Sequence, residues 1–182
     1  MRLFIGLKPS GAVLDELLDN IADLKNESVS GSFTDEENLH ITLAFLGEIR
    51  REDLPYVKEA MIRAVSDFDE GPLRITLGGF GSFNRRGRGR LYYREIGNDN
   101  RLSTLQRNLE REIRNQGFYL EKRKFMAHIT IARNCTVYDD FDYEWFCDGI
   151  FSESCAAGEV ILFESQSAGG RQIYTPIYSL KL

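Results

Sequence analysis

The sequence contains little histidine, little cysteine and no long apolar run. Its 182 residues include two histidines and three cysteines, and 42% of them are hydrophobic. No stretch approaches the ~18 consecutive apolar residues that a membrane helix needs. The apolar start of the chain is closed by Lys8 and Pro9 and is too short for a secretory signal. The composition therefore predicts an ordinary globular protein and gives no sign of a membrane segment.

The scarce cysteines and the net charge exclude further classes. Cys135, Cys147 and Cys155 show no metal-ligand spacing such as Cys-x-x-Cys, and their odd number favours reduced thiols in a cytoplasm over a disulfide framework. The net charge of −5 argues against a protein that binds nucleic acid regardless of sequence, because such proteins are usually basic. A local basic patch remains compatible with this charge.

Both histidines stand in the same tripeptide, His-Ile-Thr, at residues 40–42 and 128–130. From the composition, the second histidine would be followed by Ile-Thr with a probability of roughly 0.3%, which is low for so short a motif. A single histidine on a strand is more often a structural residue than a catalyst. Two in matching contexts favour a functional pair.

Hydrophobic periodicity predicts a chain of short strands and helices. Strands are expected at 2–7, 39–46, 73–83, 90–96, 125–132, 159–165 and 173–182. Helices are expected at about 10–25, 52–68 and 100–117, and residues 26–32 are expected to end the first of them. Elements mixed in this way indicate an α+β protein.

An internal repeat accounts for part of the histidine pattern. His40 and His128 are 88 positions apart, and the same shift carries residues 2–46 onto 90–134 without a gap. Arg2-Leu3 then falls on Arg90-Leu91, and a strand, a helix and a histidine-bearing strand occur twice in the same register. A loose likeness between any two such segments would explain the apolar matches but not the shared tripeptide. We therefore expect an internal duplication, with two facing lobes in one domain spanning residues 1–182.

Strand alternation places the polar residues of each tripeptide on one face. An apolar face is expected for Leu39, Ile41, Leu43 and Phe45. The opposite face carries His40 and Thr42, and the second strand repeats this with His128 and Thr130. If a pseudo-two-fold axis relates the lobes, the two polar faces meet across a cleft.

Two facing imidazoles suit acid–base catalysis, because one can accept a proton while the other donates one near neutral pH. Threonine hydroxyls two residues further on can hydrogen-bond phosphate oxygens, on which charge builds during phosphodiester cleavage. Metal ligation is the rival use of paired histidines. It fits less well, because no Asp, Glu or Cys stands at ligand spacing beside either His40 or His128. We expect no metal and no cofactor.

At this point several segments resemble one family. The segments "NLHITLAFLG", "HITIAR", "GGFGSFNRRGRGRLYY" and "LFESQSAGGRQIYTPIYSLKL" are similar to the RNA 2′,3′-cyclic phosphodiesterase (2′-5′ RNA ligase-like) branch of the 2H phosphoesterase superfamily. The resemblance covers nearly the whole chain. It implies a bilobal α+β fold, with two pseudo-two-fold-related antiparallel-sheet lobes and outer helices flanking a central cleft. It also implies metal-independent hydrolysis of a terminal 2′,3′-cyclic phosphate to a 2′-phosphate.

Motif position in that family implies a role for each residue. His40 corresponds to the proton donor for the leaving 3′-oxygen, His128 to the proton acceptor that activates water, and Thr42 and Thr130 to the phosphate holders. The residues alone do not separate the two histidines, because the repeat is nearly symmetric. The family often has proline where Ala127 stands, and we expect only a small loss of backbone rigidity from this departure.

Three arginines are candidates for binding the RNA backbone, since a guanidinium pairs with phosphate in a bidentate way. Arg133 follows the second motif directly, although strict alternation would place it opposite His128 unless the strand ends or twists. Arg85 and Arg86 lie in the run "NRRGRGR", which is equally consistent with a solvated turn.

Two aromatic residues, Phe83 and Tyr174, are candidates for stacking on a base or for ordinary packing. The expected partners are RNA ends or nucleosides that carry a 2′,3′-cyclic phosphate, and the chain is expected to be a monomer. Two other functions remain open. One is reversible 2′-5′ RNA ligation, which is the same chemistry with a hydroxyl in place of water. The other is an RNA- or nucleotide-binding module without turnover, for which two titratable imidazoles have no evident use.

Overall fold

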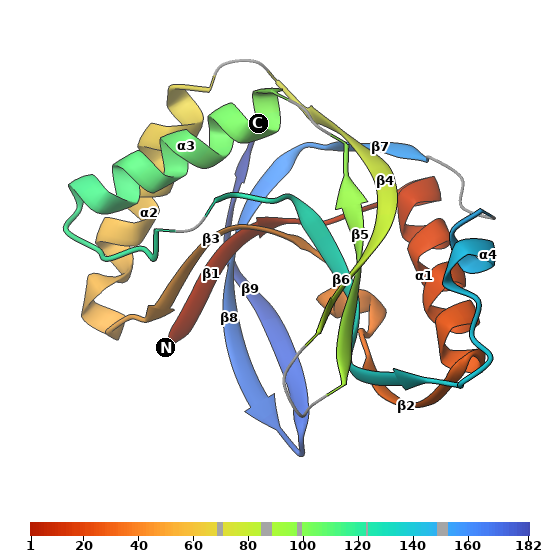
Figure 1. The fold of residues 1–182 in the computed structure, drawn as a ribbon. Helices are drawn as coiled ribbons and strands as arrows, with labels where there is room; N and C mark the ends of the chain where they lie inside the picture. Colours follow the sequence, from red (N-terminus) through yellow and green to blue (C-terminus); the bar gives the residue numbers. More distant parts are fainter. Residues whose placement is uncertain (69–70, 85–88, 98–99, 123, 149–152) are drawn as a thin grey trace.

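A computed structural model describes residues 1–68, 71–84, 89–97, 100–122, 124–148 and 153–182 (Figure 1). The strands are β1 (Arg2–Leu7), β2 (Ser28–Phe33), β3 (Ile41–Glu48), β4 (Leu73–Asn84), β5 (Arg90–Ile96), β6 (His128–Val137), β7 (Ser154–Ala157), β8 (Glu159–Ala168) and β9 (Arg171–Lys181). The α-helices are α1 (Gly11–Asn26), α2 (Leu54–Ser66), α3 (Asn100–Asn115) and α4 (Tyr143–Asp148). Two short 3₁₀ turns, Glu36–Asn38 and Arg51–Asp53, precede β3 and α2.

The described strands form one strongly curled antiparallel sheet whose order is symmetric about its centre. The order is β7-β4-β5-β6-β3-β1-β8-β9, and β2 pairs with β6 beside this path. Strands 88 positions apart, β1 with β5 and β3 with β6, therefore take equivalent places on the two sides of the centre. The two halves meet where Ile41 of β3 pairs with Ile129 of β6, residues that are themselves 88 apart. The expected bilobal α+β fold is confirmed.

The helices lie on the two flanks of the sheet (Figure 1), and α1, α2 and α3 each bury one side of the helix. On one flank, α1 turns Val13, Leu17 and Leu24 inward and packs against β2, β6 and β7. On the other flank, α2 and α3 pack against each other, α3 contacts β3, and α2 contacts β9. Leu105 and Leu109 of α3 are fully buried in that layer. Each repeat thus places its first helix over the sheet half that contains the other repeat's histidine strand.

Corresponding irregularities occur in the two histidine strands. Two register shifts between β1 and β3 leave Leu43 and Leu46 as extra residues, and two shifts between β5 and β6 leave Ile131 and one residue of 133–134 as extra. Leu43 and Ile131 are 88 positions apart. Because an extra residue reverses which face the following side chains point to, Phe45 lies on the open face and is 49% exposed. The expectation that Phe45 belongs to the apolar face is wrong for this reason.

Three elements of the structure were not predicted from the sequence. Residues expected only to end the first helix form β2, and α4 and β7 were not expected at all. β2 has serine at three of its six positions and exposes four of them, and the alternate positions hold Val29, Gly31 and Phe33, so its apolar side is too weak to reveal a strand. The strands at 2–7 and 90–96 have the expected bounds. The helix expected at 100–117 starts at Asn100 but ends at Asn115, and the helix expected at 52–68 spans Leu54–Ser66 after a 3₁₀ turn.

Candidate active site

The two His-Ile-Thr segments come together at the centre of the sheet. Ile41 and Ile129 pair across the junction and are both fully buried. Continuing this antiparallel register by one residue in each direction sets His40 opposite Thr130, and Thr42 opposite His128. Neighbouring side chains alternate faces, so these four point away from the buried isoleucines and gather on the open face of the sheet.

Both imidazoles are held by the same backbone contact. His40 Nδ1 lies 2.6 Å from the carbonyl oxygen of Asn38, and His128 Nδ1 lies 2.8 Å from the carbonyl oxygen of Met126. A carbonyl only accepts hydrogen bonds, so Nδ1 carries the hydrogen in both rings. Nε2 is then the nitrogen left for chemistry, as a proton acceptor in the neutral ring and a donor in the cation.

His40 stands against an aromatic wall. Its ring centroid lies 4.7 Å from that of Phe4, 5.1 Å from that of Tyr174 and 6.1 Å from that of Phe163. Removal of water by this burial lowers the pKa of His40 from 6.5 to about 4, with smaller contributions in the same direction from the charges of Arg133, His128 and Lys8. The hydrogen bond to the Asn38 carbonyl acts in the opposite direction and does not offset the burial. His40 is therefore neutral near pH 7 in the unliganded protein.

Neutral His40 also fixes the hydroxyl of Thr42. Thr42 Oγ1 lies 3.0 Å from His40 Nε2. Since Nδ1 already carries the hydrogen of the neutral ring, Thr42 donates and Nε2 accepts. Protonation of Nε2 would release the Thr42 hydroxyl to donate to another acceptor, such as a phosphate oxygen.

His128 has a more open setting. Among the described residues, its one ring contact is Tyr93, at 5.2 Å and 67°. Tyr93 in turn stacks on Phe83, at 4.8 Å and 23°. Phe83 is 44% exposed and is thus available to a base, whereas Tyr174 packs edge-on against His40.

Arg133 lies on the same side of β6 as His128 and Thr130, although strict alternation predicted the opposite. The extra residue Ile131 produces this reversal. The Arg133 guanidinium forms no ion pair or hydrogen bond with any other described residue, and its charge is felt at His40. It is therefore a cation available to an anionic ligand.

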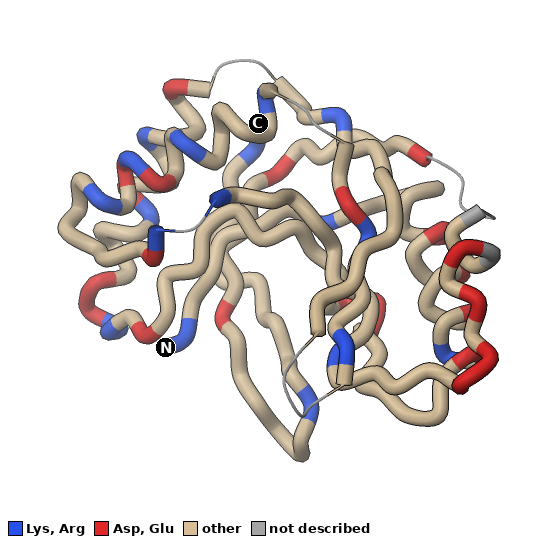
Figure 2. The backbone as a smooth tube through the Cα atoms, in the orientation of Figure 1, with Lys and Arg blue, Asp and Glu red and all other residues tan. Residues whose placement is uncertain are grey.

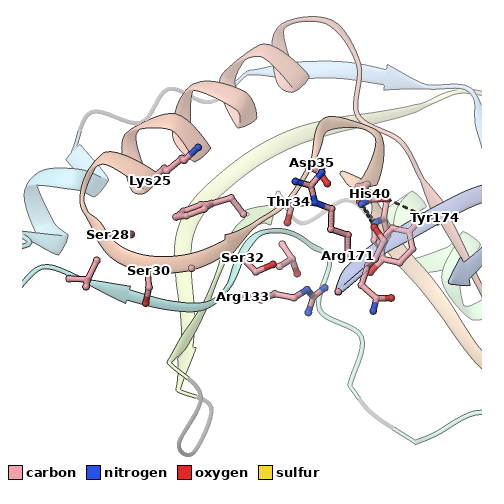
Figure 3. A pocket seen from close by; sticks show the side chains of 17 residues that line it. Lys25, Ser28, Ser30, Ser32, Thr34, Asp35, His40, Arg133, Arg171 and Tyr174 are labelled. Carbon is pink, nitrogen blue, oxygen red and sulfur yellow. Dashed lines mark hydrogen bonds between the residues drawn. The ribbon is translucent and has the colours of Figure 1, made fainter. Parts of the chain in front are cut away.

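A cavity of about 600 Å³ opens beside these groups, within the range of small-molecule sites (Figure 3). Its wall includes His40, Thr130 and Arg133. Thr42 and His128 are not part of that wall; they adjoin it through the hydrogen bond to His40 and through the strand register. Arg85 and Arg86 lie outside the described residues.

Asn38 is a site residue that the sequence patterns did not single out. Its side-chain nitrogen donates to the Gln172 carbonyl at 2.8 Å, and its side-chain oxygen accepts from the Tyr174 N–H at 3.1 Å. The same residue supplies the carbonyl that holds His40. It thus ties strand β9 to the turn that carries His40, and only the position two residues before the motif could have indicated it.

Metal centres and membrane spans are two other features that side chains and helices can reveal. No group of three or more His, Cys, Asp and Glu side chains is arranged to hold a metal ion in the described part of the chain. No helix among the described residues has the length and apolar character needed to cross a membrane.

Known proteins similar to this chain form a consistent group. An RNA 2′,3′-cyclic phosphodiesterase of Thermotoga maritima is 33% identical over 133 residues, which are 73% of this chain and 70% of that protein. One of Archaeoglobus fulgidus is 30% identical over 134 residues, 73% of this chain and 72% of that protein. A crystal structure of E. coli LigT complexed with 3′-AMP matches with a TM-score of 0.74 and 25% identity, covering 100% of this chain and 97% of that one. The structure of TT0787 of Thermus thermophilus has a TM-score of 0.80 at 21% identity, covering 100% of this chain and 98% of that one, and shows the shared fold.

The family model of LigT-like phosphoesterases matches residues 7–93 and 96–174. These segments contain both His-Ile-Thr motifs, Asn38 and Arg133. The chain belongs to the LigT-like phosphoesterases of the 2H phosphoesterase superfamily.

Proposed function

We propose that this phosphoesterase hydrolyses the 2′,3′-cyclic phosphate of an RNA end or a nucleoside to a 2′-phosphate, with the two histidines as acid and base and without a metal. The observation that carries the proposal is the meeting of the two His-Ile-Thr segments at the Ile41–Ile129 pair, with Nδ1 of both rings held by a carbonyl. This arrangement leaves two Nε2 atoms on one face for proton transfer. The relatives are RNA 2′,3′-cyclic phosphodiesterases, which supports the same reaction.

In the proposed reaction, His128 Nε2 accepts a proton from a water molecule whose oxygen forms the new bond to phosphorus. The bond between phosphorus and the 3′-oxygen breaks, and the proton on His40 Nε2 moves to that oxygen. Each turnover thus consumes one water and leaves His128 protonated and His40 neutral, so both rings exchange a proton with solvent before the next cycle.

The phosphate needs donors because negative charge grows on its non-bridging oxygens as water attacks. The hydroxyls of Thr42 and Thr130 and the guanidinium of Arg133 are the donors we assign to it. The anion also favours the charged form of His40. Substrate binding therefore supplies the condition under which His40, neutral in the free protein, takes up the proton that it later donates.

The cysteines bear on the cellular location in which we propose that the reaction takes place. The three cysteines, all within the described residues, are thiols, which fits the cytoplasmic location that we propose. The RNA ends in such a compartment are the proposed partners, and we propose a monomer.

The test is product analysis after incubation with nucleoside 2′,3′-cyclic phosphates and with RNA that ends in a cyclic phosphate, with and without EDTA. We expect a 2′-phosphate in both samples. A 3′-phosphate would mean that the other oxygen leaves, and loss of turnover in EDTA would contradict the metal-free mechanism. Joining of a cyclic-phosphate end to a 5′-hydroxyl RNA, without hydrolysis, would replace the hydrolase by a 2′-5′ ligase.

A further inference from the structure

Most of the cavity lies beyond the groups that carry the proposed chemistry. From His40 it runs along β2 to Lys25, near the end of α1, with the tip of the β8–β9 hairpin on its other side (Figure 3). We call this part the β2 groove. Its polar side chains are Lys25, Ser28, Ser30, Ser32, Thr34, Asp35 and Arg171.

The groove offers hydrogen-bond donors that no described residue uses. Among the described residues, the hydroxyls of Ser30, Ser32 and Thr34 have no hydrogen-bond partner, whereas that of Ser28 donates to the Leu24 carbonyl. Ser30 and Ser32 are exposed. Free hydroxyls in a row suit a ligand that presents acceptors at intervals.

The groove also holds two cations that pair with no carboxylate in the described part of the chain. Lys25 and Arg171 form no ion pair with any described residue, in contrast to Arg63, Arg94 and Arg111 elsewhere. Asp35 is the one acidic side chain in the wall, against the cations Lys25, Arg133 and Arg171. The chain carries a net charge of −5, and its acidic residues lie mostly on the helices and turns, including Glu36 and Glu37 directly after Asp35, while the strands carry fewer charges (Figure 2).

The two walls of the groove are fixed in place. β2 pairs with β6 along one edge, and among the described strands none pairs with its other edge. The opposite wall is held by Asn38, which bonds the main chain of β9 at Gln172 and Tyr174, directly after Arg171. From Ser28 to Ser32 the strand spans roughly 13 Å at its usual rise per residue. The groove is therefore preformed and extends well beyond the space that one phosphate needs.

We infer that the β2 groove binds the phosphodiester backbone of the RNA strand that leads to the terminal cyclic phosphate. Proteins that bind single strands without sequence preference use a positively charged groove that tracks the backbone. Here Lys25 and Arg171 contact phosphates, and Ser30, Ser32 and Thr34 donate to phosphate or ribose oxygens. The protein then prefers an RNA oligomer to a mononucleotide. This inference rests on the proposed function, because the strand is positioned by the cyclic phosphate at the histidines.

The experiment compares two substrates in two variants. The substrates are a nucleoside 2′,3′-cyclic phosphate and an RNA hexamer that ends in a cyclic phosphate. The test variant is Lys25→Ala/Arg171→Ala, and the control Arg107→Ala/Lys181→Ala removes the same charges from exposed positions outside the cavity. In the test variant, KM for the hexamer should rise about ten-fold, while kcat/KM for the mononucleotide stays within about two-fold.

Salt dependence supplies a second measurement. For the wild type, the logarithm of the association constant for the hexamer should fall linearly with the logarithm of the salt concentration. In the test variant this slope should be shallower by about 0.7 for each phosphate that the variant no longer binds. The control should keep both the wild-type KM and the wild-type slope. Equal effects of the test variant on both substrates, or no effect on either, would contradict the proposal that the β2 groove binds the RNA backbone.

Direct binding separates this inference from the proposed function. Fluorescence anisotropy of a labelled RNA hexamer that ends in a 2′-phosphate reports binding without turnover. A wild type that binds this RNA but hydrolyses no cyclic phosphate, with binding abolished in the Lys25→Ala/Arg171→Ala variant, would refute the function and keep the groove. A wild type that hydrolyses both substrates with equal kcat/KM would keep the function and refute the groove.

Discussion

The two histidines share a backbone design and differ in their surroundings. Each ring is held through Nδ1 by the carbonyl two residues earlier, and each strand carries an extra residue, Leu43 or Ile131, at the same place in the repeat. Yet His40 packs among three aromatic rings, whereas His128 meets one described ring, that of Tyr93. Backbone symmetry thus sets where the two nitrogens are, and side-chain packing sets which proton each one holds.

The neighbouring positions differ in the same way. Gly6 lies in the first strand of its repeat, before the strand that carries His40. Arg94 occupies the equivalent position of the second repeat, 88 residues later. A Cβ at Gly6 would stand 2.5 Å from the Ile41 carbonyl oxygen, so no larger residue fits there. Arg94 is fully buried and pairs with Glu16 at 2.7 Å, which fastens α1 to β5. One lobe therefore brings backbone close to its histidine, and the other uses the same position to hold a helix.

The prediction with the largest expected effect tests whether both histidines are needed for catalysis. His40→Ala and His128→Ala should each lower kcat/KM for a cyclic phosphate by about 10³-fold, because each removes one of two coupled proton transfers. The double variant should lose little more than either single one, since the remaining histidine cannot complete the cycle alone. Steady-state kinetics on folded variants, checked by circular dichroism, measures this. A single variant that keeps activity within ten-fold of the wild type would show that one histidine suffices.

The second prediction uses a pair of counterparts, Arg133 and Phe45, which follow their motifs at the same distance and both lie on the open face. Arg133→Ala should lower kcat by about 10²-fold, because the guanidinium stabilises charge that develops on the phosphate. Phe45→Ala should change kcat by less than about two-fold. Arg133→Lys should recover part of the loss, since lysine keeps the charge but not the fork of donors. Equal losses at the two positions would remove Arg133 from the reaction.

The contrast between these counterparts also shows what the sequence can and cannot predict. The repeated tripeptide and the offset of 88 predict two equivalent histidine strands whose polar faces come together, and the structure shows that these strands pair at Ile41 and Ile129. The faces of Phe45 and Arg133 could not be predicted, because they depend on one extra residue in each strand. Nothing in the apolar pattern around Leu43 or Ile131 announces a bulge.

The less periodic parts of the site were harder still. β2 has serine at three of its six positions, and its place beside β6 depends on contacts with Ala132, Arg133 and other residues about 100 positions away. The role of Asn38 depends on β9, more than 130 positions later. The low pKa of His40 arises from Phe4 and Tyr174, which come from opposite ends of the chain. Such long-range packing leaves no local pattern.

The third prediction concerns the protonation of His40. Its pKa is about 4 in the folded protein, against 6.5 for the ordinary group, so the unfolded chain binds more protons between these values. The neutral ring's contribution to stability is therefore complete above pH 6.5 and is lost as pH falls toward 4. The loss amounts to up to about 3 kcal/mol. Urea unfolding at pH 7 and pH 4.5 should show a smaller decrease in free energy for His40→Gln than for the wild type.

The same titration decides the role of His40 in the complex. With a bound 2′-phosphate product, NMR titration of the ring should show a raised pKa, because the anion favours the imidazolium. A ring that stays neutral below pH 5 in the complex would be a proton acceptor, and the roles proposed for His40 and His128 would be exchanged. Equal decreases in stability for His40→Gln and the wild type would contradict the low pKa itself.

The smallest effect separates Asn38 from its counterpart Met126. Both supply a backbone carbonyl to a histidine, but the Asn38 side chain also bonds β9 at Gln172 and Tyr174, while Met126 is 43% exposed. Asn38→Ala should lower the free energy of unfolding by about 1–2 kcal/mol and kcat/KM by about ten-fold, because removing its two hydrogen bonds frees Tyr174 from the His40 ring. Met126→Ala should alter neither by more than about 0.5 kcal/mol or two-fold. A positioning role further requires that Asn38→Ala move the pKa of His40 toward 6.5, as water reaches a ring that Tyr174 no longer covers. An unchanged His40 titration in a destabilised Asn38→Ala protein would reduce Asn38 to a structural tie between β9 and the turn before β3.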